Sequence, residues 1–290
     1  MKISHRTSTI ILTAGLLALA VSGNAQSQLE HYYQFSTGTA NDQVGTANGT
    51  LLNGASITGG ALVTAGGNGG TSGQWGGTGP MLTLNSGAVS GITGAFTIED
   101  WFTCTTGWPK YDTLYAFSDG STDNYLLGAP VRGYSPWPSG VGLLGAGGLT
   151  RSQISTWDIV LNGIWLDQGG PHQTVLTYDG TTFNYYVDGV LANYSGLSAT
   201  ATDPGFNLST LTDIGINGGS PYGDPALTGS TYSFGILSGA ISASQVAKLY
   251  GLGDDANPSA IGVVVPEPGS MALAMLGGAG LLLWRRRQAE

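Results

Sequence analysis

The sequence predicts an all-β domain made of short strands joined by tight turns, and three observations lead to that class. The chain of 290 residues contains 49 Gly, and charged side chains make up 9% of it. The segment AFTIEDWFT at 95–103 alternates apolar and polar residues with a period of two. Asp-Gly pairs at 179–180 and 188–189 bracket a second such segment. Because Asp-Gly accepts positive φ, it is a strong hairpin signal, and a strand–turn–strand–turn–strand meander is expected there.

The chain is predicted to fold rather than to stay disordered, because it carries 7 Trp, 13 Tyr and 7 Phe. One helix is expected in the exported part, in ISASQVAKLYGLG at 241–253. Ser242 with Gln245 three residues later fits a capping box, and Val246, Leu249 and Tyr250 form its apolar stripe.

Alternation on the two clearest strands predicts which side chains share a face. We expect apolar residues of both strands to face a common side, with Val187 in the core: Phe96, Ile98, Phe183, Tyr185 and Val187. Asp100 falls on the same side as Phe96. Its carboxylate is expected to be satisfied by backbone donors near a sheet edge, because an unpaired buried charge is costly. Cys104 is the single cysteine, which excludes an internal disulfide, and it is interpreted as a small core residue rather than a nucleophile.

The N-terminal residues predict a signal peptide, 1–25. Lys2, His5 and Arg6 form a basic start, and 10–21 form an apolar helix. Small residues at 22–25 then allow a cut after Ala25. An apolar core of about 12 residues is too short to span a membrane, so export through the Sec translocon is expected.

The C-terminal residues, 265–290, combine three features in a fixed order. Pro266, Glu267 and Pro268 form an extended tripeptide, because both prolines fix φ and lack a donor. An apolar helix at 269–284 follows, and it is expected to enter the membrane at least transiently. Arg285, Arg286 and Arg287 are expected to hold the end of the chain in the cytoplasm.

In all three features this tail resembles the PEP-CTERM sorting signal of Gram-negative bacteria. The resemblance implies recognition and processing by an exosortase-type enzyme at Pro266, Glu267 and Pro268. It also implies an inner-membrane intermediate that ends at the cell surface or in the extracellular matrix. An ordinary tail anchor is the alternative, but a plain anchor does not require Pro-Glu-Pro before it. The sequence therefore divides into a signal peptide at 1–25, a folded domain at 26–255, a linker at 256–264 and the sorting signal at 265–290.

The folded part resembles the laminin-G-like, concanavalin A-like domains of bacterial surface proteins. The resemblance rests on GAFTIEDWF at 94–102, on VLTYDGTTFNYYVDGVL at 175–191 and on the closing segment from DIGING to SASQVAKLY at 213–250. It covers about 95–255 well and 29–94 loosely. It implies a two-sheet antiparallel jelly-roll sandwich. The chain departs from the family pattern at Asp100, where a small apolar residue is usual.

Charge and motifs exclude several classes of function. The chain has 9 Lys and Arg against 18 Asp and Glu, a formal net charge of −9, whereas nucleic-acid binding requires basic surface. Retaining glycoside hydrolysis requires two carboxylates about 5 Å apart, but Glu99 and Asp100 are adjacent and point to opposite faces. His31 and His172 are interpreted as polar residues at strand ends rather than general bases. No enzymatic activity is predicted, and a glycoside hydrolase is the less favoured reading.

A carbohydrate-binding role is the main expectation, and a purely structural coat or biofilm-matrix protein is the alternative. Aromatic rings in loops can stack on sugar faces, and five lie in Gly- and Pro-rich sequence: Trp108, Tyr111, Tyr134, Trp137 and Tyr222. Each of them could equally be a loop aromatic that covers the edge of the core. No cofactor is expected, although Asp119, Asp123 and Asp224 offer oxygen ligands of the kind that calcium prefers. The expected partner is a polysaccharide or the matrix that contains it.

Overall fold

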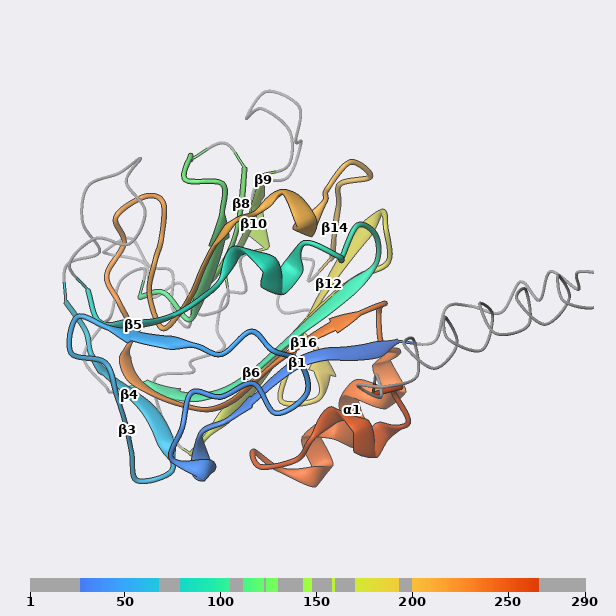
Figure 1. The fold of residues 1–290 in the computed structure, drawn as a ribbon. Coiled ribbons are helices and arrows are strands. Elements are labelled where there is room, and N and C mark those ends of the chain that lie inside the picture. Colours follow the sequence, from blue (N-terminus) through green and yellow to red (C-terminus); the bar gives the residue numbers. More distant parts are fainter. Residues whose placement is uncertain are drawn as a thin grey trace, which may run out of the picture.

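The protein is a sandwich of two antiparallel β-sheets, which confirms the predicted fold class (Figure 1). In the computed structural model the two sheets face one another, and a short helix covers the outside of one of them. The residues that the structure describes are 27–67, 79–104, 112–122, 124–129, 143–147, 158–159, 170–192 and 200–265.

Sheet A is the larger sheet, and its strand order is β13-β12-β11-β6-β16-β4-β3, with β1 also paired to β16 and β14 to β12. Its strands are β1 (Gln28–Gln34), β3 (Ser56–Thr58), β4 (Ala61–Ala65), β6 (Phe96–Cys104), β11 (His172–Tyr178), β12 (Thr182–Val187), β13 (Val190–Leu191), β14 (Thr200–Thr202) and β16 (Thr228–Ser238). The central strand is β6, because β11 pairs along one side of it and β16 along the other.

Sheet B has the strand order β10-β9-β8-β7-β15-β5-β2. Its strands are β2 (Thr50–Leu52), β5 (Met81–Leu84), β7 (Tyr115–Ser118), β8 (Tyr125–Ala129), β9 (Leu143–Gly147), β10 (Asp158–Ile159) and β15 (Asp213–Ile216). Short 3₁₀ helices lie between strands at η1 (Phe35–Thr37), η2 (Ser86–Val89) and η3 (Leu208–Thr210), and η4 (Pro258–Ile261) follows the last strand.

The main core fills the space between the sheets. All five side chains predicted to share a face lie in it, including Val187, which is 7% exposed. Aromatic rings dominate one part of the core, where Phe96, Tyr178, Phe183 and Phe206 pack against one another with ring centres 4.4–6.1 Å apart. Cys104, at the end of β6, is half-buried and packs against the same core.

The predicted meander of β11, β12 and β13 is confirmed. β11 pairs with β12 and β12 with β13, both antiparallel. Asp188 and Gly189 adopt φ of 47° and 80° in the second turn. Positive φ at both positions is typical of the turns that join tight hairpins, so the Asp-Gly pair fixes the register at this point.

The predicted helix is α1 (Ala243–Leu252), and its capping box is present. The Ser242 side chain accepts from the Gln245 amide, and the Gln245 side chain accepts from the Ser242 amide at 2.9 Å. Val246 and Leu249 are buried against the outer face of sheet A. Tyr250, 39% exposed, stacks on Trp101 of β6 with a centre distance of 5.6 Å and an angle of 6°. The helix therefore covers the second face of the central strand.

Residues 256–264, expected to be a linker, are instead packed against the domain. Asn257 caps η4 through the Ser259 amide, and Ile261 and Val263 are buried with the residues under α1. Val264 then pairs in parallel with Gln28 of β1. The segment, ANPSAIGVV, looks like a linker in sequence because Asn, Pro, Ser and Gly are typical of loops. Pro258, however, begins a 3₁₀ helix, and Ile261 and Val263 are buried.

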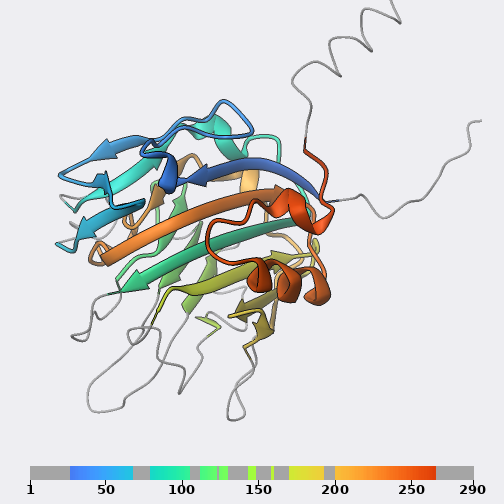
Figure 2. The same cartoon turned by 90° about the horizontal axis from the view of Figure 1, so that it is seen from below.

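The first and last described parts of the chain meet at one end of the sandwich (Figure 2). The Leu29 amide donates to the Val264 carbonyl at 2.7 Å, and the Val264 amide donates to the Ser27 carbonyl at 2.9 Å. Within the described ranges no helix is long and apolar enough to cross a membrane. The two predicted terminal helices and the sorting residues Pro266, Glu267, Pro268, Arg285, Arg286 and Arg287 lie outside those ranges.

Truncating Val187 to Ala is expected to lower the free energy of unfolding by about 1–3 kcal/mol, because methyl groups are lost from a packed core. Val190→Ala, three residues along the same hairpin and 68% exposed, is the matched control and should change it by less than about 0.5 kcal/mol. Urea unfolding followed by tryptophan fluorescence measures both. Equal effects in the two variants would contradict the assignment of Val187 to the core.

Candidate binding site

The aromatic residues predicted to contact sugars belong to three segments that leave the sandwich from one end. Cys104 at the end of β6 pairs with Gly229, and the Thr228 amide donates to Asp112 at 2.9 Å. The Thr113 amide donates to the Pro225 carbonyl at 2.9 Å, and the Leu114 amide to the Gly128 carbonyl at 2.8 Å. These bonds hold together the ends from which segments 105–111, 130–142 and 217–226 leave. We call this part of the molecule the aromatic end.

The aromatic end lies opposite the meeting point of the chain's two ends. Phe96, at the start of β6, pairs with Ser238, which in turn pairs with Gln28. The nine residues of β6 then extend roughly 26 Å to Cys104. Figure 2 shows β6 (green) pointing away from the end at which the first and last described residues lie. The aromatic end therefore lies on the far side of the domain from Ser27 and Val264.

Tyr222 is the candidate that lies within the described residues, and it packs across the outer face of sheet B. Its hydroxyl donates to the Thr122 carbonyl at 3.0 Å, and its ring meets Tyr125 edge-on with centres 5.1 Å apart. Ser220 fixes the loop around it, because its hydroxyl donates to Asp224 at 2.6 Å and accepts from the Tyr222 amide at 3.1 Å. Tyr222 is thus half-buried, and one edge of its ring is already engaged.

Trp108, Tyr111, Tyr134 and Trp137 lie outside the described residues, so their role stays a prediction. The structure places the strand ends from which their segments leave. Sequence reasoning did not single out Asp112, a buried carboxyl that fixes the start of β16 at this end. Burial raises the pKa of Asp112 to about 6, although hydrogen bonds from Thr228 act to lower it.

The acids proposed for calcium are not gathered into a cluster in the described part of the chain. Asp119 accepts from the Ser121 amide at 2.9 Å and from its hydroxyl at 2.6 Å. Partial burial acts to raise the pKa of Asp119, but the bonds from Ser121 hold it below its usual value. Asp224 is held by Ser220, and Asp123 lies outside the described residues. No three His, Cys, Asp or Glu side chains among the described residues are placed to hold a metal ion.

Glu99 and Asp100 point to opposite faces of β6, as their adjacency predicts, and both are fully buried. Glu99 lies beneath α1 and η4, where its carboxylate accepts from Trp101 Nε1 and Gln173 Nε2, each at 2.9 Å. Burial raises the pKa of Glu99 to about 7, although these two hydrogen bonds act to lower it. A carboxylate buried in this position is not accessible to a polysaccharide.

Asp100 corrects the expectation of a carboxylate bonded to backbone donors near a sheet edge. It lies in the central strand, between β11 and β16, and it faces the other sheet. Its pKa is raised well above the usual range, first by burial and then by Glu99, while the neighbouring Thr231 acts to lower it. Burial without a cation favours the neutral carboxyl. The sequence pattern gave the face correctly, but it could not place β6 at the centre of the sheet.

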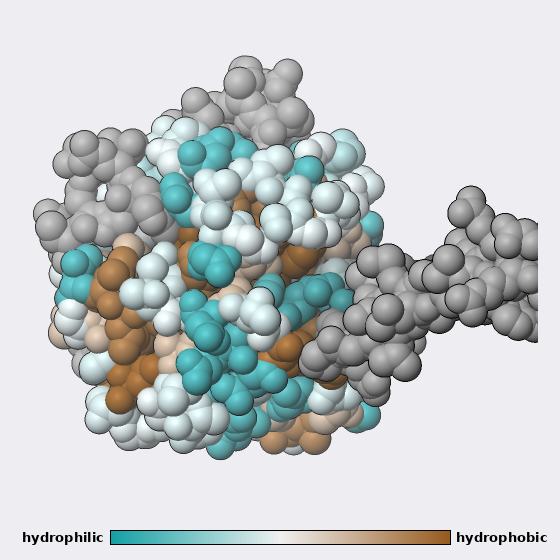
Figure 3. Space-filling model, viewed as in Figure 1, coloured by the Kyte–Doolittle hydropathy of each residue, from teal (hydrophilic) through white to brown (hydrophobic). Residues whose placement is uncertain are grey.

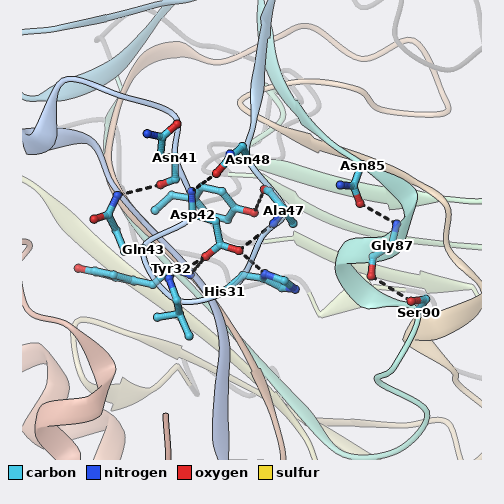
Figure 4. Close-up of polar contacts among 12 residues, drawn as sticks. His31, Tyr32, Asn41, Asp42, Gln43, Ala47, Asn48, Asn85, Gly87 and Ser90 are labelled. Atoms are coloured by element: carbon cyan, nitrogen blue, oxygen red, sulfur yellow. Dashed lines mark hydrogen bonds and ion pairs between the residues drawn. The ribbon is translucent and has the colours of Figure 1, made fainter. Parts of the chain in front are cut away.

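Both histidines of the exported part are paired with aspartates, which the sequence analysis did not foresee. His31 Nδ1 lies 2.6 Å from Asp42, whose carboxylate also accepts from the amides of Tyr32, Val44 and Ala47 at 3.1–3.2 Å (Figure 4). Partial burial acts to raise the pKa of Asp42, but the bonds from His31 and the backbone hold it at about 2. Asp42 therefore closes the loop that follows β1.

His172 Nδ1 lies 2.8 Å from Asp188, and the Gln173 amide donates to the same carboxylate at 2.9 Å. This pair fixes the open end of the β11–β12 hairpin. The hairpin register predicted from the Asp-Gly turns would have brought His172 beside Asp188, whereas nothing local in the sequence links His31 to Asp42. His172 is the first residue of β11, as predicted, whereas His31 lies in the middle of β1 rather than at a strand end. Both histidines serve the fold.

The family model described as the concanavalin A-like lectin/glucanases superfamily matches residues 76–247, more than half of the chain. The chain belongs to this superfamily. A second model, the PEP-CTERM protein-sorting motif, matches residues 264–287. This motif marks the chain as exported and sorted to the surface of a Gram-negative bacterium, and it implies processing by an exosortase-type enzyme. None of the curated protein sequences matches the chain.

Among solved structures, this chain resembles domain 4 of an extracellular arabinanase from Geobacillus stearothermophilus, solved in complex with arabinotriose. The TM-score is 0.53 at 15% identity, over 77% of this chain and 98% of that domain. It also resembles botulinum neurotoxin type C, whose cell entry depends on two ganglioside molecules, with a TM-score of 0.50 at 12% identity, over 79% of this chain and 51% of that one. At these identities the likeness concerns the fold.

The buried carboxyl of Glu99 is expected to make stability depend on pH. Its pKa is about 7 in the folded protein and near 4.5 otherwise, so folding takes up a proton between these values. The free energy of unfolding should therefore fall as pH rises from about 4.5 to 7, by at most about 1.4 kcal/mol per pH unit from this group. Glu99→Gln should flatten that part of the profile in urea melts at successive pH values.

Glu30→Gln removes another carboxylate from sheet A and serves as the control for the loss of one negative charge. The slope between pH 4.5 and 7 in Glu99→Gln is compared with the slope in this control. If Glu99→Gln and the control gave profiles parallel to that of the unmodified protein, the raised pKa of Glu99 would be wrong.

Proposed function

We propose that this protein is a non-catalytic cell-surface or extracellular-matrix protein that binds polysaccharide at its aromatic end. The main supporting observation is that three segments begin at one hydrogen-bonded set of strand ends. Trp108, Tyr111, Tyr134 and Trp137 belong to two of these segments. Tyr222 belongs to the third, in which its ring packs back over Tyr125 of β8. Aromatic rings offer flat apolar area to the faces of sugar rings, and the short polar side chains of these segments can bond hydroxyl groups. A binding role at one end needs no deep cavity.

The position of the aromatic end supports this proposal. The predicted sorting signal begins at Val265, and Val264 is held against β1 at the opposite end of the sandwich. If the protein is attached to the cell, or released from it, at the end that contains Val264, its aromatic end faces outward, toward the polymer that surrounds the cell. Export through the Sec translocon, by way of an inner-membrane intermediate, completes the route that the two ends of the sequence predict.

Burial of the acids argues against hydrolysis. Glu99 and Asp100 are the adjacent pair in the strand most similar to the family, and neither reaches solvent. They are also on opposite faces, whereas a retaining glycosidase requires two carboxylates about 5 Å apart facing one substrate. The arabinanase domain with arabinotriose is similar in fold and lends support to sugar recognition by a domain of this shape.

The exported protein is expected to bind neutral polysaccharide on a glycan array, and Trp108→Ala and Trp137→Ala should each weaken binding about tenfold, since a central aromatic contact is worth on the order of 1.4 kcal/mol. Tyr250→Ala is the matched control, because Tyr250 is an exposed aromatic on α1, away from the aromatic end. The array is run with and without calcium, so that it also tests whether Asp119, Asp123 and Asp224 bind this ion.

Two outcomes would contradict this assignment. Release of reducing sugar that a single Asp or Glu substitution abolishes would establish an enzyme. Failure to bind any glycan or isolated matrix would leave the structural coat as the better account.

Processing at the sorting motif is expected to remove Arg285, Arg286 and Arg287 from the exported protein. Mass spectrometry of the protein in its native host should therefore detect no intact C-terminal tail on the surface form, and Glu267→Ala should accumulate the full-length membrane intermediate. Glu290→Ala, beyond the arginines, is the control. Recovery of full-length protein in the inner membrane alone would favour the plain tail anchor.

A further inference from the structure

Two unpaired strand edges lie together on one flank of the sandwich. β3 ends the path of sheet A and β2 ends that of sheet B, within the residues that the structure describes. The two strands are joined by a tight turn in which the Ala55 amide donates to the Leu52 carbonyl at 3.0 Å, with Asn53 and Gly54 at φ of 55° and 88°. This short turn keeps both edges on the same flank. Alternate backbone N–H and C=O groups of an edge strand face outward without partners.

The main core reaches this flank. Leu51 of β2 lies opposite Leu82, and Ile57 of β3 lies opposite Leu62. Leu62 and Leu82 are fully buried in the main core, so Leu51 and Ile57 point to the same side. Both are nevertheless partly open, Leu51 being 38% exposed. Figure 3 shows an apolar strip on the left, over the flank that carries β3 and β5 in Figure 1.

The flank also lacks charge. Residues 43–98, which include β2, β3, β4 and β5, contain no Asp, Glu, Lys, Arg or His. The opposite flank differs, because β10 begins at Asp158 and Asp188 precedes β13. Charged residues are a common protection of natural edge strands against pairing with another chain. The chain as a whole carries a net charge of −9, so two copies repel one another, and the repulsion is weaker when they meet through surfaces free of charge.

We propose that this flank binds a second copy of the chain, with β3 paired antiparallel to β3 of the other copy across a two-fold axis at Ile57. In that register Ser56 of one copy lies opposite Thr58 of the other. The backbones of the two β3 strands then form hydrogen bonds, and no charged side chain is buried in the contact. The two Ile57 side chains and the neighbouring Leu51 side chains cover one another. This self-association goes beyond polysaccharide binding, since it uses a flank rather than the aromatic end.

The short edges set the strength of the contact. Three residues in each strand bury much less than the roughly 1,200 Å² of a stable interface, so pairing is weak in dilute solution. It becomes effective where many copies are held side by side, because tethering raises the local concentration to the millimolar range. A surface layer or a matrix provides that condition.

The test is sedimentation of the exported protein at concentrations up to about 1 mM. Concentration-dependent dimers are expected for the unmodified chain. The pair Ser56→Glu and Thr58→Glu should weaken dimerisation about tenfold or more, because like charges then lie directly opposite. The pair Ser56→Lys and Thr58→Lys should do the same, and an equal mixture of the two variants should restore dimers. Ala243→Glu with Ala247→Glu, on the exposed face of α1, adds the same charge elsewhere and should have no effect.

A second measurement does not depend on how well those variants fold. Ile57→Cys in a Cys104→Ser background should form a disulfide-linked dimer under mild oxidation, because opposed residues of an antiparallel pair are close enough to bridge. Ala243→Cys in the same background should not. A monomer throughout, or equal cross-linking at both sites, would overturn the proposal. Glycan binding by the same variants should be unchanged, so failure of this interface and failure of polysaccharide binding are distinguishable.

Discussion

Burial of both faces of β6 is the constraint on which the rest of the structure depends. One face carries Phe96, Ile98 and Asp100 into the space between the sheets, and the other carries Glu99 and Trp101 against the layer formed by α1 and η4. An antiparallel sheet can leave one face in water. This sheet does not do so along its central strand, because the chain after β16 returns across it. Residues 239–264, which include α1 and η4, are therefore part of the folded domain.

That constraint explains the two unusual acids. Glu99 keeps its hydrogen-bond partners on the helix side, and its pKa rises to about 7 because burial opposes the charged form. Asp100 faces the other sheet without a cation, so it is held neutral. Neither carboxyl is available to a substrate. The resemblance of this strand to the superfamily thus concerns its architecture, and Glu99 and Asp100 do not form the pair of facing carboxylates that a retaining glycosidase uses.

The predictable parts of the fold are those encoded within a few residues. Alternation around Ile98, the two Asp-Gly turns and the Ser242–Gln245 cap each act over a short stretch, so they predicted β6, the meander and α1 correctly. The rest depends on long-range contacts. The pairing of Val264 with Gln28 and the contact of His31 with Asp42 join segments whose sequences contain no sign of one another. Residues 256–264 were therefore predicted to be a linker although they are folded.

In the candidate site, too, some features are encoded locally and others depend on long-range contacts. Sequence could name Trp108, Tyr111, Tyr134, Trp137 and Tyr222 as loop aromatics, because Gly and Pro mark the loops around them. It could not say that their segments share one end of the sandwich, since that follows from the pairing of β6 with β16 and of β7 with β8. Nor could it foresee Asp112, whose role is to hold two of those segments together.

The arrangement of the molecule separates its proposed activities in space. Val264 and Ser27 fix the end next to the sorting signal, the aromatic end lies roughly 26 Å away along β6, and the uncharged edges of β2 and β3 lie on a flank between them. An antiparallel sandwich provides such independence because its strands run from end to end while its edges run along the sides. Contact between flanks leaves both ends free, so copies of the chain can associate side by side without covering the aromatic end. Residues 43–98, which include β2 and β3, contain no charged residue, whereas the acidic residues that give the chain its net charge of −9 lie elsewhere in the sequence.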